Sequence, residues 1–157
     1  MKRSSPLVRS LRAGTLAGVG FMAAVDEIIF HQLLAWHHFY DRSTTDIGLM
    51  TDGLLHAAEL LAISAAFIML LDLGRRRQLS KPHVLAGLCL GAGGFQLFDG
   101  IINHKVLRLH QIRYVDNVLP YDLTWNAVAI ALLLVGFGLL RQADRRYGTQ
   151  LEQTGKS

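Results

Sequence analysis

Four apolar segments, each long enough to cross a lipid bilayer, dominate the sequence, at about residues 13–39, 47–71, 82–105 and 121–140. A transmembrane helix needs about 20 apolar residues, because the hydrocarbon core is about 30 Å thick and a helix rises about 1.5 Å per residue. Hydrophobic residues make up 51% of the chain and the mean hydropathy is +0.29, which is too apolar for an ordinary soluble domain of this length. The sequence therefore predicts one all-α membrane domain over residues 1–157, a bundle of four transmembrane helices.

Basic side chains gather in three short polar segments, at residues 2–12, 75–81 and 141–156. The other two polar segments, around residues 40–46 and 111–120, are acidic or mixed. Because positively charged segments stay on the cytoplasmic side of a membrane, this distribution predicts cytoplasmic termini. We expect no binding to nucleic acid, since the basic clusters flank apolar spans and lack interleaved aromatic residues.

The pattern D-x4-H-x5-H occurs twice, with an offset of 73 positions. The aligned residues are Asp26 with Asp99, His31 with His104, and His37 with His110. The same offset aligns Gly18 with Gly91 and Gly20 with Gly93. An offset of 70 gives a weaker match of Asp52 with Asp122 and His56 with Asn126. We infer two repeated helical hairpins that run in the same direction and pack about an axis normal to the membrane.

Ionisable side chains gather in the half of the predicted spans that faces away from the cytoplasm. This half holds every histidine except His83, which we expect at the cytoplasmic surface. It also holds the acidic residues Asp26, Glu27, Asp52, Glu59, Asp99 and Asp122. Each such group costs about 2.5–3.5 kcal/mol on membrane-insertion scales, so a cluster needs partners, water or a metal ion. The cluster is therefore the candidate functional site, and it faces the periplasm.

A transition metal would satisfy this cluster, because imidazole and carboxylate ligands on facing helices suit zinc, iron or copper. Cys89 is the single cysteine and is expected to be buried and inert, so it provides no thiolate cluster. The candidate ligands are His31, Asp52, His56, Asp99 and His104, with Glu27 and Glu59 as ligands or general bases. The supporting or alternative positions are Asp26, His37, His38, His110, Asp122 and Asn126.

Ideal α-helical spacing separates these residues into several groups. Asp26 and His37 are eleven positions apart, so they share a face but lie about three turns apart along the axis. His31 points elsewhere, toward the side of Glu27. His37 and His38 are expected near the outer surface. One compact centre that uses every residue is therefore not expected.

Two alternatives need no isolated metal ion. Haem could be held axially by His31 with His104, or by His37 with His110, which would make the protein an electron-transfer bundle. A hydrogen-bonded network of the same side chains without metal would make it an assembly or scaffold protein. With a bound zinc ion and an activated water, by contrast, the site would be a membrane hydrolase.

Four stretches carry a resemblance to a known family: GFMAAVDEIIFHQLLAWHHFYD, TDGLLHAAE, GFQLFDGIINHKVLRLHQIR and YDLTWN. They resemble bacterial four-helix integral membrane proteins of unknown function, described only as predicted membrane proteins. The resemblance implies the bacterial inner membrane. Genes of this family often lie near those for cytochrome oxidase assembly, which implies respiratory or copper-related biology.

The resemblance also bears on partners and on one departure in the sequence. It implies oxidase-assembly partners, beside the lipid bilayer and a small molecule or metal ion from the periplasm, and a homo-oligomer is compatible with it. Where the family commonly reads Phe-Asp-Gly, this chain has Val25, Asp26 and Glu27, which adds a carboxylate to the site.

Overall fold

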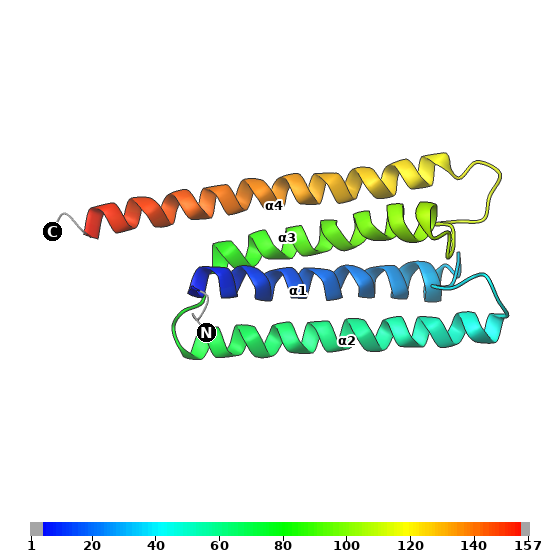
Figure 1. Ribbon diagram of the computed structural model, residues 1–157, viewed down its shortest axis with the longest axis horizontal. Helices are drawn as coiled ribbons and strands as arrows, with labels where there is room; N and C mark the ends of the chain where they lie inside the picture. The colour runs from blue at the N-terminus through cyan, green and yellow to red at the C-terminus, as the bar shows by residue number, and fades with distance from the viewer. Residues whose placement is uncertain (1–4, 155–157) are drawn as a thin grey trace.

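Four long helices run side by side in the computed structural model, which describes residues 5–154, with side chains described to residue 149 (Figure 1). The α-helices are α1 (Pro6–Asp26), α2 (Thr45–Arg75), α3 (Lys81–Phe98) and α4 (Leu119–Thr154). Two π-helical segments, η1 (Glu27–Leu33) and η2 (Asp99–Val106), continue α1 and α3 without a break. No strand occurs in the described residues. Each of the four helices is long and apolar enough to cross a membrane, which confirms the predicted fold class.

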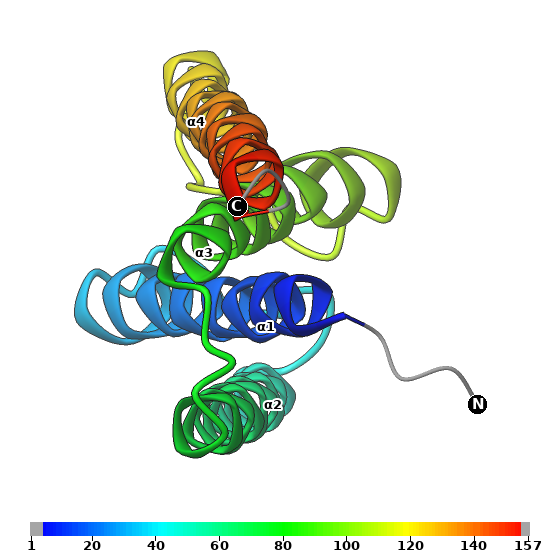
Figure 2. The ribbon, with the colours of Figure 1, turned by 90° about the vertical axis from the view of Figure 1, so that its left-hand side faces the viewer.

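The helices form a flattened bundle in the order α2, α1, α3, α4, as the end-on view shows (Figure 2). The most extensive contact is between α1 and α3, while α2 packs on α1 and α4 packs on α3. Within the described residues, α2 and α4 do not contact each other. The two helices that carry the D-x4-H-x5-H patterns therefore form the centre of the bundle.

Glycines allow the backbones of α1 and α3 to touch. A Cβ atom added to Gly18 would lie 2.1 Å from the carbonyl oxygen of Leu88, and one added to Gly91 would lie 2.0 Å from that of Thr15. The offset of 73 relates both residues of one contact to those of the other, since Gly18 corresponds to Gly91 and Thr15 to Leu88. The same reciprocity holds one turn away for Gly14 and Gly87, whose added Cβ atoms would meet the carbonyls of Val84 and Leu11. The contacts are thus symmetric, while a common origin of the two halves stays a prediction.

The apolar side chains are distributed as expected for a chain in lipid. Most buried apolar residues in the described part are alanines, whereas large side chains such as Leu61, Phe67 and Ile68 are 59–72% exposed on α2. Lipid-facing helices gain nothing from hiding large apolar groups, so small residues take the contacts between helices. Cys89 is partly exposed instead of buried, because glycine and alanine occupy the packing face of α3.

Several predicted helix boundaries are wrong. The first helix begins at Pro6 instead of about residue 13, since Ser5 caps its end by accepting from the amide of Val8 at 3.4 Å. It ends at Leu33 with the π-helical segment, so the stretch up to Phe39 is not helical. The fourth helix extends to Thr154, well beyond residue 140. Residues 1–4 of the predicted basic tail lie outside the described residues.

The glycine contacts generate a stability prediction. Replacing Gly91 by alanine should destabilise the fold by about 1–3 kcal/mol, because the new methyl group overlaps a backbone carbonyl that cannot move without separating α1 from α3. Thermal unfolding in detergent measures this. Gly138→Ala is the matched control, because nothing lies within 4 Å of its added Cβ atom. Equal melting temperatures for the two variants would contradict the packing described.

Candidate metal centre

The polar end of the bundle is shaped by the two π-helical segments. In η1 and η2 the backbone hydrogen bonds join residues five positions apart instead of four. Examples are Leu34 N to Ile29 O at 2.9 Å and Leu107 N to Ile102 O at 2.7 Å. Such π-type turns often occur at functional sites. One residue after each of these amides, the chain adopts a positive φ, at Ala35 (47°) and at Arg108 (51°). This turn directs the following residues back across the bundle end.

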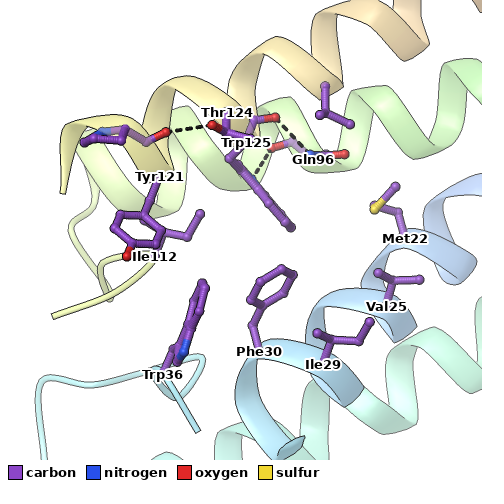
Figure 3. Close-up of a pocket in the computed structure, with 12 residues that line it drawn as sticks. Met22, Val25, Ile29, Phe30, Trp36, Gln96, Ile112, Tyr121, Thr124 and Trp125 are labelled. Carbon is purple, nitrogen blue, oxygen red and sulfur yellow. Dashed lines mark hydrogen bonds between the residues drawn. The ribbon is translucent and has the colours of Figure 1, made fainter. Parts of the chain in front are cut away.

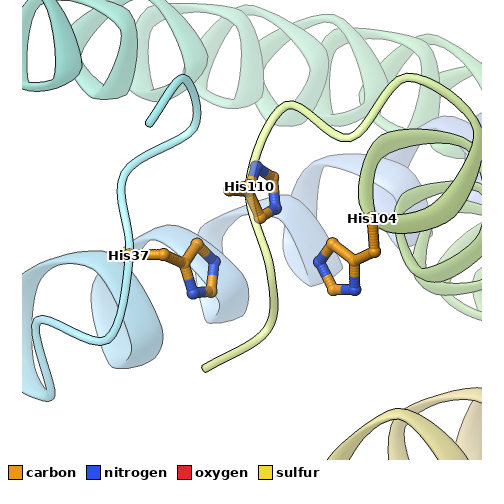
Figure 4. Close-up of side chains that lie close together, drawn as sticks. All are labelled: His37, His104 and His110. Carbon is orange, nitrogen blue, oxygen red and sulfur yellow. The ribbon is translucent and has the colours of Figure 1, made fainter. Parts of the chain in front are cut away.

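Four histidines meet at this end, and all are 2–4% exposed. They are His31, His37, His104 and His110. The rings of His37 and His110 stack with centroids 4.5 Å apart. His31 lies 4.5 Å from His37, and His104 lies 4.7 Å from His110, both edge to face. Figure 4 shows the rings of His37, His104 and His110 converging on a common interior from two loops and one helix.

Reciprocal hydrogen bonds hold two of these rings. The Nδ1 of His37 donates to the carbonyl of Ile112 at 2.9 Å, and the Nδ1 of His110 donates to the carbonyl of Phe39 at 2.9 Å. A carbonyl accepts only, so in both rings the proton lies on Nδ1 and Nε2 keeps a lone pair. Neither Nε2 has a hydrogen-bond partner in the described residues. Metal-bound histidines are typically oriented in this way.

The two rings are also kept neutral by their surroundings. Burial, followed by the neighbouring imidazoles of His110, His31 and His104, lowers the pKa of His37 to about 2. Burial likewise lowers the pKa of His110, despite the opposing effect of Asp99. A neutral imidazole is the form that binds a metal ion.

Two aspartates face the same interior from the starts of the π-helical segments. Asp26 Oδ2 lies 3.7 Å from His31 Nε2, and Asp99 Oδ2 lies 3.0 Å from His104 Nε2. Asp99 Oδ1 lies 3.7 Å from the Nε2 of His110. Both aspartates are 2% exposed. The 3.0 Å contact lacks hydrogen-bonding geometry, so Asp99 Oδ2 and His104 Nε2 stay without partners in the described part.

Ligand atoms at this end are close enough for one ion. In the sets His37, His104, His110 and Asp26, His31, His37, the ligand atoms lie within 4.8 Å of one another. Mixed imidazole and carboxylate sets suit first-row transition metals. A third set of Glu27, His31 and Asp52 lies on the other edge of the His31 ring.

Asp52 ties the first loop to the bundle. It is 1% exposed and accepts from His31 Nδ1 at 3.0 Å, from His38 Nδ1 at 2.6 Å and from the amide of Phe39 at 2.7 Å. Because these contacts leave few of its acceptor positions free, Asp52 fixes the positions of His31 and of the loop that carries His37.

Other predicted ligands lie outside this centre. His56 has a half-exposed side chain and pairs with Glu59, its Nδ1 lying 2.5 Å from Glu59 Oε1. Asp122 pairs with Lys105, and its Oδ1 lies 3.9 Å from the Nδ1 of His104, so it borders the cluster. Asn126 donates to the backbone carbonyl of Asp122 at 2.8 Å.

His83 is buried at the opposite end instead of at the surface. It is 3% exposed, between Ser80 at 2.7 Å and Asp144 at 3.1 Å. The helix α4 covers it, because α4 extends beyond the predicted residue 140 and so brings Asp144 alongside.

The prediction from α-helical spacing, which separated His37 and His110 from His31 and His104, is wrong. His37 and His38 are not at the end of a longer helix, since the helix has already ended and the chain turns at Ala35. His37 therefore returns to the interior. The repeated D-x4-H-x5-H pattern contains the four histidines that lie together, but the spacing on an ideal helix placed them apart.

A separate cavity of about 570 Å³ adjoins the centre between α1 and α4 (Figure 3). Apolar and aromatic side chains line it, among them Phe30, Trp36 and Trp125. Phe30 and Trp36 directly precede His31 and His37 in the chain. No carboxylate or imidazole lines the cavity, so it is distinct from the metal-ligand cluster.

Comparison with known proteins gives one match. The sequence pattern of the family described as "Predicted membrane protein (DUF2243)" matches residues 13–143 of the 157. No curated protein and no solved structure matches the chain. The family match includes α2 and α3 and most of α1 and α4, and it assigns no activity.

The contacts of Asp52 generate a second prediction. Replacing it with alanine should destabilise the fold by about 3–5 kcal/mol, because a buried carboxylate that holds two imidazoles and an amide is lost. Hydrogen exchange should rise over residues 35–44, where the amide of Phe39 loses its acceptor. Asp46→Ala, an exposed carboxylate on the same helix, is the control. Unchanged exchange over residues 35–44 would show that Asp52 does not hold the loop.

Proposed function

The chain belongs to this family of predicted membrane proteins, and we propose that its function is to bind a transition metal ion with His31, His37, His104, His110, Asp26 and Asp99. The observation that carries the proposal is the pair of Nε2 atoms of His37 and His110. Each is buried, neutral and without a partner, while its ring is fixed by a carbonyl. Buried polar atoms without partners are costly, and a metal ion would satisfy them.

Zinc, iron and copper are the ions that fit best. The set combines four imidazoles with two carboxylates, and imidazole favours these ions over magnesium or calcium, which prefer oxygen ligands. All six ligands are 2–4% exposed, so the ion would be largely shielded from water. Such shielding is compatible with a metal-handling, electron-transfer or hydrolytic role.

The contacts of the four histidines give less support to haem binding and to a network without metal. Haem needs a wide apolar slot between two axial histidines, whereas the His37 and His110 rings stack at 4.5 Å and His31 lies 4.5 Å from His37. A structural network without metal would be expected to satisfy its members. Instead, unpartnered atoms gather on the inner side of the rings.

A general-base role for Glu27 or Glu59 has less support than a role in orientation. Glu27 Oε2 lies 2.9 Å from the Nδ1 of His31, whereas the Nε2 of that ring faces Asp26. Glu27 would thus orient His31, as carboxylates often do for a metal-bound histidine. Glu59 is paired with His56.

The location proposed for the protein is the bacterial inner membrane, with both termini in the cytoplasm and the metal centre near the periplasmic surface. The basic segments and the four spans support this orientation. A metal centre at that surface is compatible with a partner in the assembly of a respiratory oxidase.

Metal binding can be measured on protein purified in detergent. Elemental analysis should find zinc, iron or copper in the wild type, and His37→Ala with His110→Ala should lower the affinity by more than the roughly 10–100-fold typical of outer-shell partners. His83→Gln is the matched control, a buried histidine at the other end of the bundle. Metal-free wild-type protein, or equal metal content in both variants, would refute the proposal, and a Soret band would favour haem.

Reporter fusions test the orientation. A reporter joined after Thr44 should be active in the periplasm and one joined after Gln78 in the cytoplasm, because only the second follows the basic cluster Arg75–Arg77. The opposite pattern would place the metal centre on the cytoplasmic side.

A further inference from the structure

A groove of about 410 Å³ opens between η1 and α2, beside the candidate metal centre. Its lining residues are Glu27, Ile28, Gln32, Leu49, Gly53 and His56. Unlike the apolar cavity between α1 and α4, this groove has ionisable groups in its wall. The groove connects the half-exposed imidazole of His56 with the buried side chain of Glu27.

Two buried carboxylates stand behind the half-exposed His56. Glu59 is 2% exposed and binds His56 Nδ1 through Oε1 at 2.5 Å, while its Oε2 has no partner in the described residues. Glu27 is also 2% exposed, and its Oε2 lacks a partner in hydrogen-bonding geometry. Gln32 donates to the other oxygen of Glu27 at 2.8 Å. The two carboxylates are therefore oriented: Oε2 of Glu59 has no partner in the described residues, and Oε2 of Glu27 faces His31.

These groups lead to the metal centre through one shared ring. Glu27 Oε2 lies 2.9 Å from His31 Nδ1, and Nε2 of the same ring faces Asp26 at 3.7 Å. His31 is thus the boundary between the groove and the centre. The centre itself is closed to solvent, because its ligands are 2–4% exposed, so an ion needs a path to reach it.

The groove lies within about two helical turns of the membrane boundary, by the length of α2. Asp72, paired with Arg9 and Arg76, marks the other boundary on α2. About 20 residues of helix cross the roughly 30 Å core, so the near boundary falls around Asp52. His56 then lies about one turn inside it, and Glu59 about two turns inside.

The acidic groove is present in one half of the protein only. At the positions equivalent to Glu27, His56 and Glu59, the other half has Gly100, Asn126 and Ala129. The ligands of the centre, in contrast, occur in both halves. The centre therefore does not need these three side chains to complete its symmetric ligand set, and a separate role for them is required.

We propose that His56, Glu59 and Glu27 form a loading site, which first captures a divalent transition-metal ion in the groove and passes it through His31 to the buried centre. This inference rests on the proposed metal-binding function. His56 and Glu27 line the groove and Glu59 binds His56, so the groove offers fewer ligands, one of them half-exposed, than the four buried imidazoles. Negative charge in a low-dielectric groove also raises the local concentration of cations.

Stopped-flow loading of metal-free protein with Co²⁺, followed by the visible absorption of the ion, tests the loading site. Glu59→Gln and His56→Gln should each bind Co²⁺ roughly tenfold more slowly, within the range of electrostatic effects on association rates. Their final stoichiometry and affinity should equal those of the wild type, because the buried ligands are unchanged. Asp46→Asn is the matched control, since it removes an exposed charge from the same end of α2 and should load at the wild-type rate.

The outcomes separate this inference from the proposed function. Wild-type loading rates in both variants would overturn the loading site while leaving the metal centre intact. Reduced final stoichiometry would also overturn it, since His56 and Glu59 would then be ligands of the centre itself. A wild type that takes up no Co²⁺ would overturn the proposed function, and the loading site with it. Circular dichroism of each variant confirms that slow loading does not reflect unfolding.

Discussion

Backbone contact between α1 and α3 is the interaction on which the rest of the structure depends. Gly18 and Gly91 each face a carbonyl of the opposite helix, at distances that no other residue allows. Because the two helices touch along their glycines, the π-helical segments η1 and η2 that continue them end beside each other. The aspartates at the starts of these segments, Asp26 and Asp99, therefore face a common interior.

The cluster of four histidines then follows from how the two segments end. Positive φ angles at Ala35 and Arg108 return the loops over the bundle end, and each loop places one histidine on a carbonyl of the other. His37 and His110 thus lock the loops together while keeping their Nε2 atoms free. In hydrocarbon such unpartnered groups are costly, so the same geometry that closes the fold also creates a demand for a cation.

The two halves share this centre and differ beside it. Glu27 and His56 line a groove on one side, with Glu59 bound to His56, where the other half has glycine, asparagine and alanine. On the other side an apolar, aromatic cavity adjoins the same histidines. The symmetric histidine cluster therefore lies between two unlike surroundings, one with ionisable groups and one apolar.

The sequence by itself determined the four apolar helices and the set of polar residues that gathers at one end of the bundle, because hydropathy and the repeated D-x4-H-x5-H pattern can be read from the chain alone. It could not determine which histidines share a centre. On ideal α-helices, His37 lies far from His31, and His56 looks equivalent to the buried ligands. Only the tertiary structure decided this, because the π-helical turns redirect the chain after Leu33 and Val106, and the hydrogen bonds that join the two loops connect residues more than 70 positions apart.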